Sequence, residues 1–262
     1  MNGKECPIGV FDSGVGGIGT LAALVRELPQ EHFVYYGDVL HAPYGTKTTE
    51  EVQQLVRGVV RELEKSEIKA LVIACNTATG AAAAMLRAEK DYPVIGMEPA
   101  LKPAEEGWRG GRILVMATPL TLRQEKFRSL MERFGAHAVP LACPGLMELV
   151  EKEDETGARK YLEELFGAWE LEKVDAVVLG CTHYVFLKPM IRRMLPERTL
   201  ITDGNQGTAR QLRRVLAQRG LLRDGKEGSI ELHTSGDPET MMPVMERLYR
   251  KGMEISRDEQ RW

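Results

Sequence analysis

Two similar stretches decide the fold: Lys69-Ala-Leu-Val-Ile-Ala-Cys75-Asn76-Thr77 and Val174-Asp-Ala-Val-Val-Leu-Gly-Cys181-Thr182-His183. Each has a run of apolar residues typical of a buried strand, then a small residue, a cysteine and polar residues suited to capping a following helix. The similarity indicates an internal duplication. We therefore predict two α/β halves that face each other, each offering a strand-end cysteine to a shared cleft.

The rest of the chain alternates short β-branched runs with longer segments of helical period. Strands are predicted at residues 8–11, 33–36, 70–74, 94–96, 112–117, 138–141, 176–179 and 199–202. Helical segments such as 21–28, 49–65 and 79–90 fall between them. This rhythm predicts two similar three-layer α/β domains with mainly parallel sheets, related by a pseudo-two-fold axis. Active loops of such sheets lie at the carboxyl ends of the strands, so we expect the site between the domains.

The composition excludes several classes of protein. The chain has 262 residues, a net charge of -3 and four cysteines. It lacks the basic surplus of proteins that neutralise nucleic-acid phosphates. Its apolar stretches of about eight residues are too short for a spanning helix, which needs ~20. No cysteine or histidine spacing suits zinc. We expect a cytoplasmic protein with reduced thiols and no metal, nucleic-acid or membrane partner.

The paired cysteines suggest acid–base chemistry. A thiol acts as a base only as thiolate, which costs about 2 kcal/mol at pH 7 from a reference pKa of about 8.5. A position just before a helix favours the anion through backbone N–H groups and the helix dipole. Two such groups across a cleft suit inversion of a stereocentre, in which one removes a proton and the other returns one to the opposite face.

A glycine loop at residues 14–19 offers a competing interpretation. It matches G-x-G-x-x-G after a strand, and Asp38 follows about 20 residues on, as in dinucleotide-binding proteins. However, Asp12 precedes the loop and would bring a carboxylate close to a pyrophosphate. We therefore favour a tight turn that projects Asp12 and Ser13 into the cleft, with glycines that let the backbone approach a small anion.

Five segments together carry a family resemblance. They are Phe11-Asp-Ser-Gly-Val-Gly-Gly17, Gly37-Asp38 with Pro43-Tyr44-Gly45, Ala74-Cys-Asn-Thr-Ala-Thr79, Gly180-Cys-Thr-His-Tyr184 and Thr234-Ser-Gly-Asp237. In order and spacing they closely resemble the glutamate racemases of the aspartate/glutamate racemase superfamily, over about residues 8–249. The resemblance implies a cofactor-independent enzyme that interconverts L- and D-glutamate and supplies D-glutamate for peptidoglycan.

The resemblance also implies roles for individual residues. Cys75 is similar to the base on the D-glutamate face and Cys181 to the base on the L-glutamate face. Asp12 is similar to a carboxylate that assists Cys75 and meets the substrate ammonium, and His183 to a group beside Cys181. Matching substrate-binding positions include Asp12 and His183 together with Ser13, Pro43, Tyr44, Gly45, Asn76, Thr77, Thr118, Thr121 and Thr182.

A functional glutamate of the family follows the Cys143-Pro144 segment by eight residues from the cysteine, which points to Glu151. The match is weaker there, because Gly145-Leu146-Met147-Glu148 replaces bulkier apolar residues and a proline. Glu148 therefore competes with Glu151 for this role.

The C-terminal part of the chain is predicted to form a helix at 209–219, a strand at 229–233 and a helix at 238–250. The residues alone do not decide whether these elements extend the second half or complete the first. The family's organisation implies a first domain of residues 1–97 and 207–262 and a second of 98–206, and we expect a homodimer that acts on a small molecule.

The alternatives to a glutamate racemase are an aspartate racemase or another racemase of the superfamily, a redox protein with a reversible Cys75–Cys181 disulfide, and a binding protein without activity.

Overall fold

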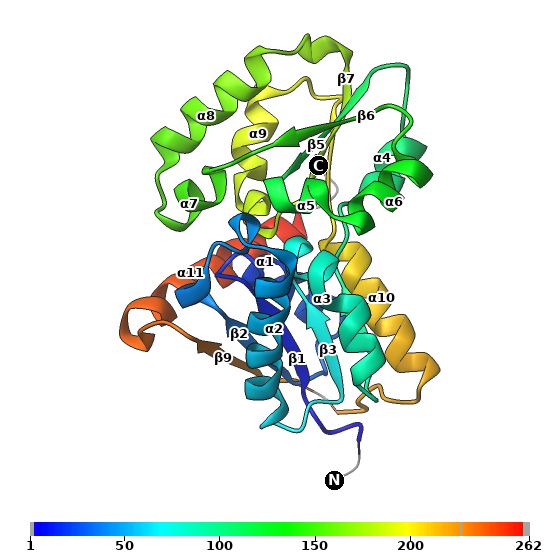
Figure 1. Cartoon of the computed structure of the whole chain (residues 1–262), viewed down its shortest axis with the longest axis vertical. Helices are drawn as coiled ribbons and strands as arrows, with labels where there is room; N and C mark the ends of the chain where they lie inside the picture. The colour runs from blue at the N-terminus through cyan, green and yellow to red at the C-terminus, as the bar shows by residue number, and fades with distance from the viewer. Residues whose placement is uncertain (1–2, 226, 259–262) are drawn as a thin grey trace.

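The computed structural model describes residues 3–225 and 227–258, which form two parallel sheets. The first sheet has the order β4-β3-β1-β2-β9 and the second the order β6-β5-β7-β8 (Figure 1). The strands are β1 (Ile8–Asp12), β2 (Phe33–Gly37), β3 (Ala70–Ile73), β4 (Val94–Gly96), β5 (Arg112–Ala117), β6 (Ala138–Ala142), β7 (Val174–Leu179), β8 (Leu200–Asp203) and β9 (Ile230–Thr234). All pairings between them are parallel, which confirms the predicted fold class.

The two sheets repeat one topology. Strands β4-β3-β1-β2 of the first correspond in connectivity to β8-β7-β5-β6 of the second, and β9 is added beside β2. The register repeats as well: Phe11 pairs with Ile73, two residues before Cys75, and Met116 pairs with Leu179, two residues before Cys181. The cysteines therefore occupy equivalent strand ends, as the similarity of the two stretches predicts.

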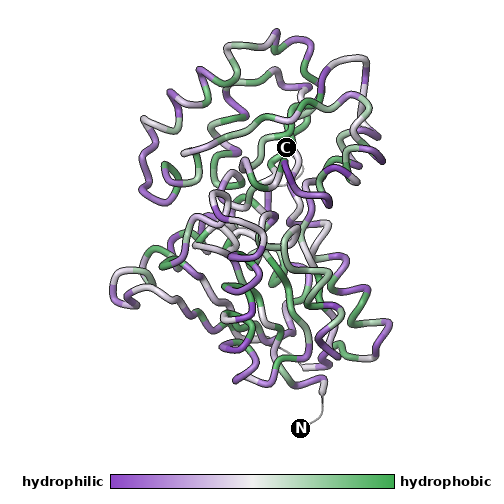
Figure 2. Tube along the Cα trace, in the orientation of Figure 1, coloured by the Kyte–Doolittle hydropathy of each residue, from purple (hydrophilic) through white to green (hydrophobic). Residues whose placement is uncertain are grey.

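Helices cover both faces of each sheet. They are α1 (Ile18–Glu27), α2 (Thr49–Glu64), α3 (Asn76–Glu89), α4 (Leu101–Glu106), α5 (Pro119–Arg123), α6 (Glu125–Phe134), α7 (Leu146–Glu151), α8 (Glu155–Gly167), α9 (Lys188–Met194), α10 (Asn205–Gln218) and α11 (Pro238–Arg257). In the first sheet, alternate residues of β1 face opposite ways: Val10 joins the core with α1, α10 and α11, and Phe11 the core with α2 and α3. The apolar strands run through the interior of both domains (Figure 2).

The core is continuous between the domains. One cluster of buried apolar side chains runs from Ile18 of α1 through Phe186 to Leu179 of β7. Close packing of this kind fixes the positions of the strand ends that face each other. The domains thus meet through apolar contact beside the predicted site.

Most predicted elements are present within a few residues, but one differs in type. Cys75 directly precedes α3, as predicted. After Cys181 the chain instead forms a 3-10 helix, η4 (Thr182–Leu187), before α9 begins. A 3-10 helix turns more tightly than an α-helix, so the two motifs present their polar residues differently.

The tail lies beside the first sheet. Strand β9 pairs with β2, and α10 and α11 pack on α1. The division into 1–97 with 207–262 and 98–206 stays a prediction, and residues 1–2, 226 and 259–262 of it lie outside the described residues. Within the described part of the chain, no helix is both long and apolar enough to cross a membrane.

Candidate active site

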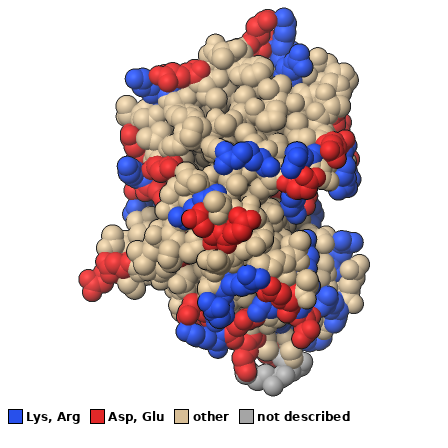
Figure 3. Space-filling view, in the orientation of Figure 1, with Lys and Arg blue, Asp and Glu red and all other residues tan. Residues whose placement is uncertain are grey.

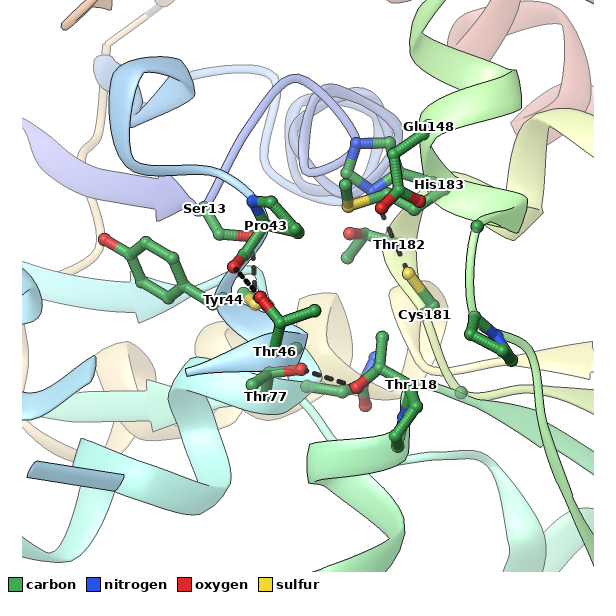
Figure 4. A pocket seen from close by; sticks show the side chains of 18 residues that line it. Ser13, Pro43, Tyr44, Thr46, Thr77, Thr118, Glu148, Cys181, Thr182 and His183 are labelled. Atoms are coloured by element: carbon green, nitrogen blue, oxygen red, sulfur yellow. Dashed lines mark hydrogen bonds between the residues drawn. The ribbon is translucent and has the colours of Figure 1, made fainter. Parts of the chain in front are cut away.

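A pocket of about 190 Å³ lies where the carboxyl ends of the strands of the two sheets meet. Figure 4 shows Ser13 and Thr77 from the first sheet's side across the pocket from Cys181 and His183 of the second, with the Tyr44 ring turned away from them. Its lining consists of Ser13, Pro43, Tyr44, Gly45, Thr46, Cys75, Asn76, Thr77, Thr118, Pro119, Pro144, Gly145, Met147, Glu148, Gly180, Cys181, Thr182 and His183. Both cysteines of the duplicated motif thus line one pocket.

Cys75 lies at the N-terminus of α3. Its Sγ accepts a hydrogen bond from the backbone N–H of Ala78 at 3.4 Å and lies 3.5 Å from Oγ of Ser13. Burial and the nearby carboxylate of Asp12 nevertheless raise the pKa of the Cys75 thiol to about 12, against the two hydrogen bonds that lower it. Cys75 is therefore a thiol at neutral pH, because the helix N-terminus does not outweigh burial.

Cys181 has a histidine as its partner. Nδ1 of His183 lies 3.8 Å from the Cys181 sulfur, and Nε2 of the same ring lies 2.9 Å from Oε1 of Glu151. Burial works against the charged imidazole, but the hydrogen bonds to Cys181 and Glu151 outweigh it and raise the pKa of His183 well above its usual 6.5. Burial likewise opposes ionisation of Glu151, and the hydrogen bond with His183 lowers its pKa. The pair holds a protonated imidazole against the sulfur.

Asp12 lies behind the wall of the pocket. It is fully buried at the end of β1, where Oδ1 accepts the backbone N–H of Gly14 at 2.8 Å and Oδ2 accepts the hydroxyl of Thr182 at 3.0 Å. Burial raises the pKa of its carboxyl group. The predicted projection of Asp12 into the cleft needs correction, because its two oxygens bond to Gly14 and Thr182 and it does not line the pocket.

Three threonines predicted to bind substrate form one hydroxyl cluster. Oγ1 of Thr77 lies 3.0 Å from that of Thr118 and 2.9 Å from that of Thr121, and Thr118 donates to Thr121 at 3.0 Å. Thr77 and Thr118 line the pocket, whereas Thr121 lies behind them. This cluster brings the two domains together at the floor of the site.

Tyr44 is held from outside the pocket. Its hydroxyl donates to Oδ2 of Asp38 at 2.6 Å, and Oδ1 of Asp38 lies 2.7 Å from Nδ1 of His41. The Asp38 carboxylate is thus already bonded within the protein. Asp38 directly follows β2, where a ribose-binding acid would stand, but its carboxylate oxygens face Tyr44 and His41.

The glycine loop packs against the second domain. A Cβ on Gly14 would lie 2.5 Å from Oε1 of Glu151, and one on Gly16 would lie 2.4 Å from Nδ1 of His183. These glycines are required because the imidazole and carboxylate occupy the space where side chains would be. The predicted approach of a small anion to this backbone is therefore corrected: protein side chains fill the space.

The structure separates the two competing glutamates. Glu151 bonds to His183 and does not line the pocket, whereas Glu148, one helical turn earlier in α7, does. Six lining residues were not named as site residues from the sequence: Thr46, Pro119, Pro144, Gly145, Met147 and Gly180. Thr46, Pro119 and Gly180 directly adjoin predicted site residues, and Met147 adjoins the candidate Glu148.

The remaining cysteines lie outside the pocket. Cys6 is partly exposed, and Cys143 is buried, with its carbonyl oxygen accepting the hydroxyl of Tyr184 at 3.1 Å. All four cysteines are free thiols. Within residues 3–225 and 227–258, no group of three or more histidine, cysteine, aspartate or glutamate side chains could hold a metal ion.

Comparisons with known proteins match the resemblance read from the sequence. The sequence pattern of a family described as Asp/Glu/Hydantoin racemase matches residues 12–212. A glutamate racemase of Clostridium acetobutylicum is 51% identical over 217 residues, covering 81% of this chain and 84% of that protein. A structure of glutamate racemase from Thermus thermophilus in complex with β-chloro-D-alanine is 36% identical, with a TM-score of 0.81 over 94% of this chain and 93% of the other. A structure of a glutamate racemase isoform from Bacillus anthracis is 34% identical, with a TM-score of 0.85 over 94% of this chain and 94% of the other. The predicted family resemblance is confirmed.

Proposed function

Because the chain belongs to the Asp/Glu/hydantoin racemase family and is thus an isomerase, we propose that it interconverts L- and D-glutamate with Cys75 and Cys181 as its two acid–base groups. One observation carries this proposal: the cysteines stand at equivalent strand ends and both line one pocket. A racemase needs two proton-transfer groups on opposite sides of one carbon, and a duplicated fold supplies them.

In the L-to-D direction, the Cys181 thiolate removes the α-proton from L-glutamate. The electron pair of the broken C–H bond passes to the α-carbon and its carboxylate, and the Cys75 thiol donates its proton to the opposite face. The product leaves Cys181 as thiol and Cys75 as thiolate, and the reverse direction begins from that state. The resting enzyme fits the first step, because burial keeps Cys75 protonated while His183 places an N–H against the other sulfur.

The neighbouring residues support these two groups. We propose that Glu151 positions the His183 ring, and that Asp12 positions Thr182 through its hydroxyl. The cluster of Thr77, Thr118 and Thr121 offers hydroxyl donors for a substrate carboxylate. We propose substrate contacts also for Ser13, Pro43, Tyr44, Gly45, Asn76, Thr182 and His183.

We further propose the wider setting that the family suggests. The enzyme supplies D-glutamate for peptidoglycan in the cytoplasm, acts as a homodimer without a cofactor, and has no nucleic-acid partner. On the face in Figure 3, positive and negative side chains are interspersed over both domains. This face lacks the continuous basic area that binds phosphates.

The test is racemisation of L-glutamate in heavy water with no cofactor added. We expect loss of optical activity together with incorporation of deuterium at the α-carbon, and turnover of aspartate at a much lower rate. Cys75→Ala and Cys181→Ala should each abolish racemisation. Full activity of either variant would refute the two-cysteine mechanism, and faster turnover of aspartate than of glutamate would refute the substrate.

A further inference from the structure

The pocket wall carries an unpaired carboxylate. Among the described residues that line the pocket, Glu148 is the one acidic side chain, and the rest offer hydroxyl, thiol, amide, imidazole and apolar groups. Asp12 and Glu151 are the neighbouring acids, and neither lines the pocket. Their carboxylates are already bonded, to Gly14 and Thr182 in one case and to His183 in the other.

Glu148 is aimed into the pocket by the start of α7. The helix begins at Leu146 after Gly145, whose φ of 82° lies in the left-handed region that favours glycine. Figure 4 shows the Glu148 side chain reaching into the pocket beside His183 and Thr182, on the same side as Cys181. Its half-buried side chain makes no hydrogen bond or ion pair with another described residue, so its negative charge faces the space that a ligand would occupy.

An α-amino acid brings an ammonium group into this space. A buried or half-buried ammonium requires a partner, since desolvating an unpaired charge is costly. Asp12 is the residue that the resemblance assigns to it, yet Asp12 does not line the pocket, and each of its oxygens already accepts a hydrogen bond. We propose that Glu148 binds the α-ammonium group of the substrate and so selects amino acids over dicarboxylates of the same length.

This inference rests on the proposed racemase function, and it concerns a residue at which the chain departs from the family pattern. An opposite arrangement, in which Glu148 faces the distal carboxylate of glutamate, would make the two groups repel. The two arrangements give opposite signs on removal of the charge. Neutralising Glu148 weakens glutamate binding in the first and strengthens it in the second.

The test compares D-glutamate with glutarate, which has the same two carboxylates and no ammonium group. Binding of each is measured by calorimetry on the whole protein, wild type and Glu148→Gln, so that no turnover is needed. We expect the variant to bind D-glutamate about tenfold more weakly, equivalent to about 1.4 kcal/mol, and glutarate more tightly, because a repulsion is removed. Its KM should rise by the same factor with kcat nearly unchanged.

The matched control is Glu163→Gln, which removes the same charge from the exposed face of α8 and should change neither affinity. Equal weakening of both ligands in Glu148→Gln would indicate a purely structural role and overturn the proposal. Unchanged or tighter binding of D-glutamate would overturn it as well. Because binding is measured separately, a wild type that discriminates by charge but does not racemise would contradict the proposed function and leave this inference supported.

Discussion

The two cysteine motifs occupy the same place in a duplicated fold but have different surroundings. Cys75 begins an α-helix and has a serine hydroxyl and a backbone N–H as partners, while Cys181 begins a 3-10 helix and has the imidazole of His183. The first set of partners is neutral and leaves the Cys75 pKa at about 12, whereas the second set includes a group whose pKa is raised well above 6.5. Equivalent strand ends therefore surround the two sulfurs with different groups, neutral ones at Cys75 and an imidazole at Cys181.

The difference arises from residues two positions beyond each cysteine. Thr77 turns into the hydroxyl cluster with Thr118 and Thr121, and His183 turns back onto its own cysteine. A cationic imidazole next to a sulfur favours charge separation that a hydroxyl cannot supply. The two similar strand ends thus differ in the groups that face their sulfurs.

Loss of either sulfur should have the largest effect. Cys75→Ser and Cys181→Ser replace the thiol by a hydroxyl that ionises far less readily, so we expect racemisation to fall about 10³-fold or more. Optical rotation of L- and D-glutamate solutions measures the rate in both directions. Because the two enantiomers have equal free energy, each variant must lose the same factor of kcat/KM in the L-to-D and D-to-L directions. An unequal loss would reveal a second activity in the preparation.

Gly16→Ala should cause the next largest loss of activity, because it disturbs His183 beside Cys181 and leaves the surroundings of Cys75 unchanged. The added methyl group would lie 2.4 Å from Nδ1 of His183 and 2.6 Å from its Cε1, and the buried ring has Glu151 on its other side. We expect activity to fall about tenfold or more while the protein remains folded. Gly58→Ala is the control, because its Cβ would meet nothing within 4 Å. It should keep full activity and raise the free energy of unfolding by about 0.5–1 kcal/mol.

Glu151→Gln should alter stability in a defined pH range. Glu151 has a lowered pKa in the folded protein, so its contribution is present above 4.5 and disappears as pH falls through the folded value. His183 has a raised pKa, so its contribution is complete below 6.5 and disappears as pH rises through its folded value. The pair therefore stabilises the fold most between these limits.

Urea unfolding across pH 4 to 9 measures this effect. At pH 6 we expect Glu151→Gln to lower the free energy of unfolding by about 2 kcal/mol, since a charge-assisted hydrogen bond becomes a neutral one. The difference in the free energy of unfolding between wild type and Glu151→Gln should become smaller toward both ends of this pH range. A gap that stays constant with pH would show that lost packing, and not the ion pair, causes it.

Ser13→Ala should have the smallest effect, on the Cys75 side. The Ser13 hydroxyl lies 3.5 Å from the sulfur, and this contact lowers the Cys75 pKa. Its loss should raise that pKa further and slow racemisation by about threefold, as expected for one weak hydrogen bond. Alkylation of Cys75 by iodoacetamide, followed by mass spectrometry, should also become slower. Faster alkylation would mean that the serine shields the thiol instead of stabilising its anion.

Much of the fold could be predicted because its signals are local. The apolar runs that end at Cys75 and Cys181 are strands in the structure, and their repetition predicts the repeated topology. The position of Asp12 could not be predicted, because its partner Thr182 lies in the other domain. The need for glycine at position 16 could not be predicted either, because the ring that fills the space beside it belongs to His183 of the other domain.

The local sequence pattern could not decide between Glu148 and Glu151. The two residues are one helical turn apart, so they share a face of α7 and the sequence treats them alike. Only the packing of α7 against η4 separates them, with Glu151 beneath the imidazole and Glu148 at the pocket wall. The sequence also predicts a helix to be capped after Cys181 without indicating its type, and the structure forms a 3-10 helix there, because no single residue marks the tighter turn.

The central claim is that Cys75 and Cys181 act on opposite faces of one carbon. It is tested most directly by α-hydrogen exchange of each pure enantiomer in heavy water, followed by NMR, with Cys75→Ser and Cys181→Ser. The account predicts that Cys75→Ser exchanges the α-hydrogen of L-glutamate only and Cys181→Ser that of D-glutamate only, each without inversion. Exchange of both enantiomers by one variant would contradict it, because a single thiol would then reach both faces.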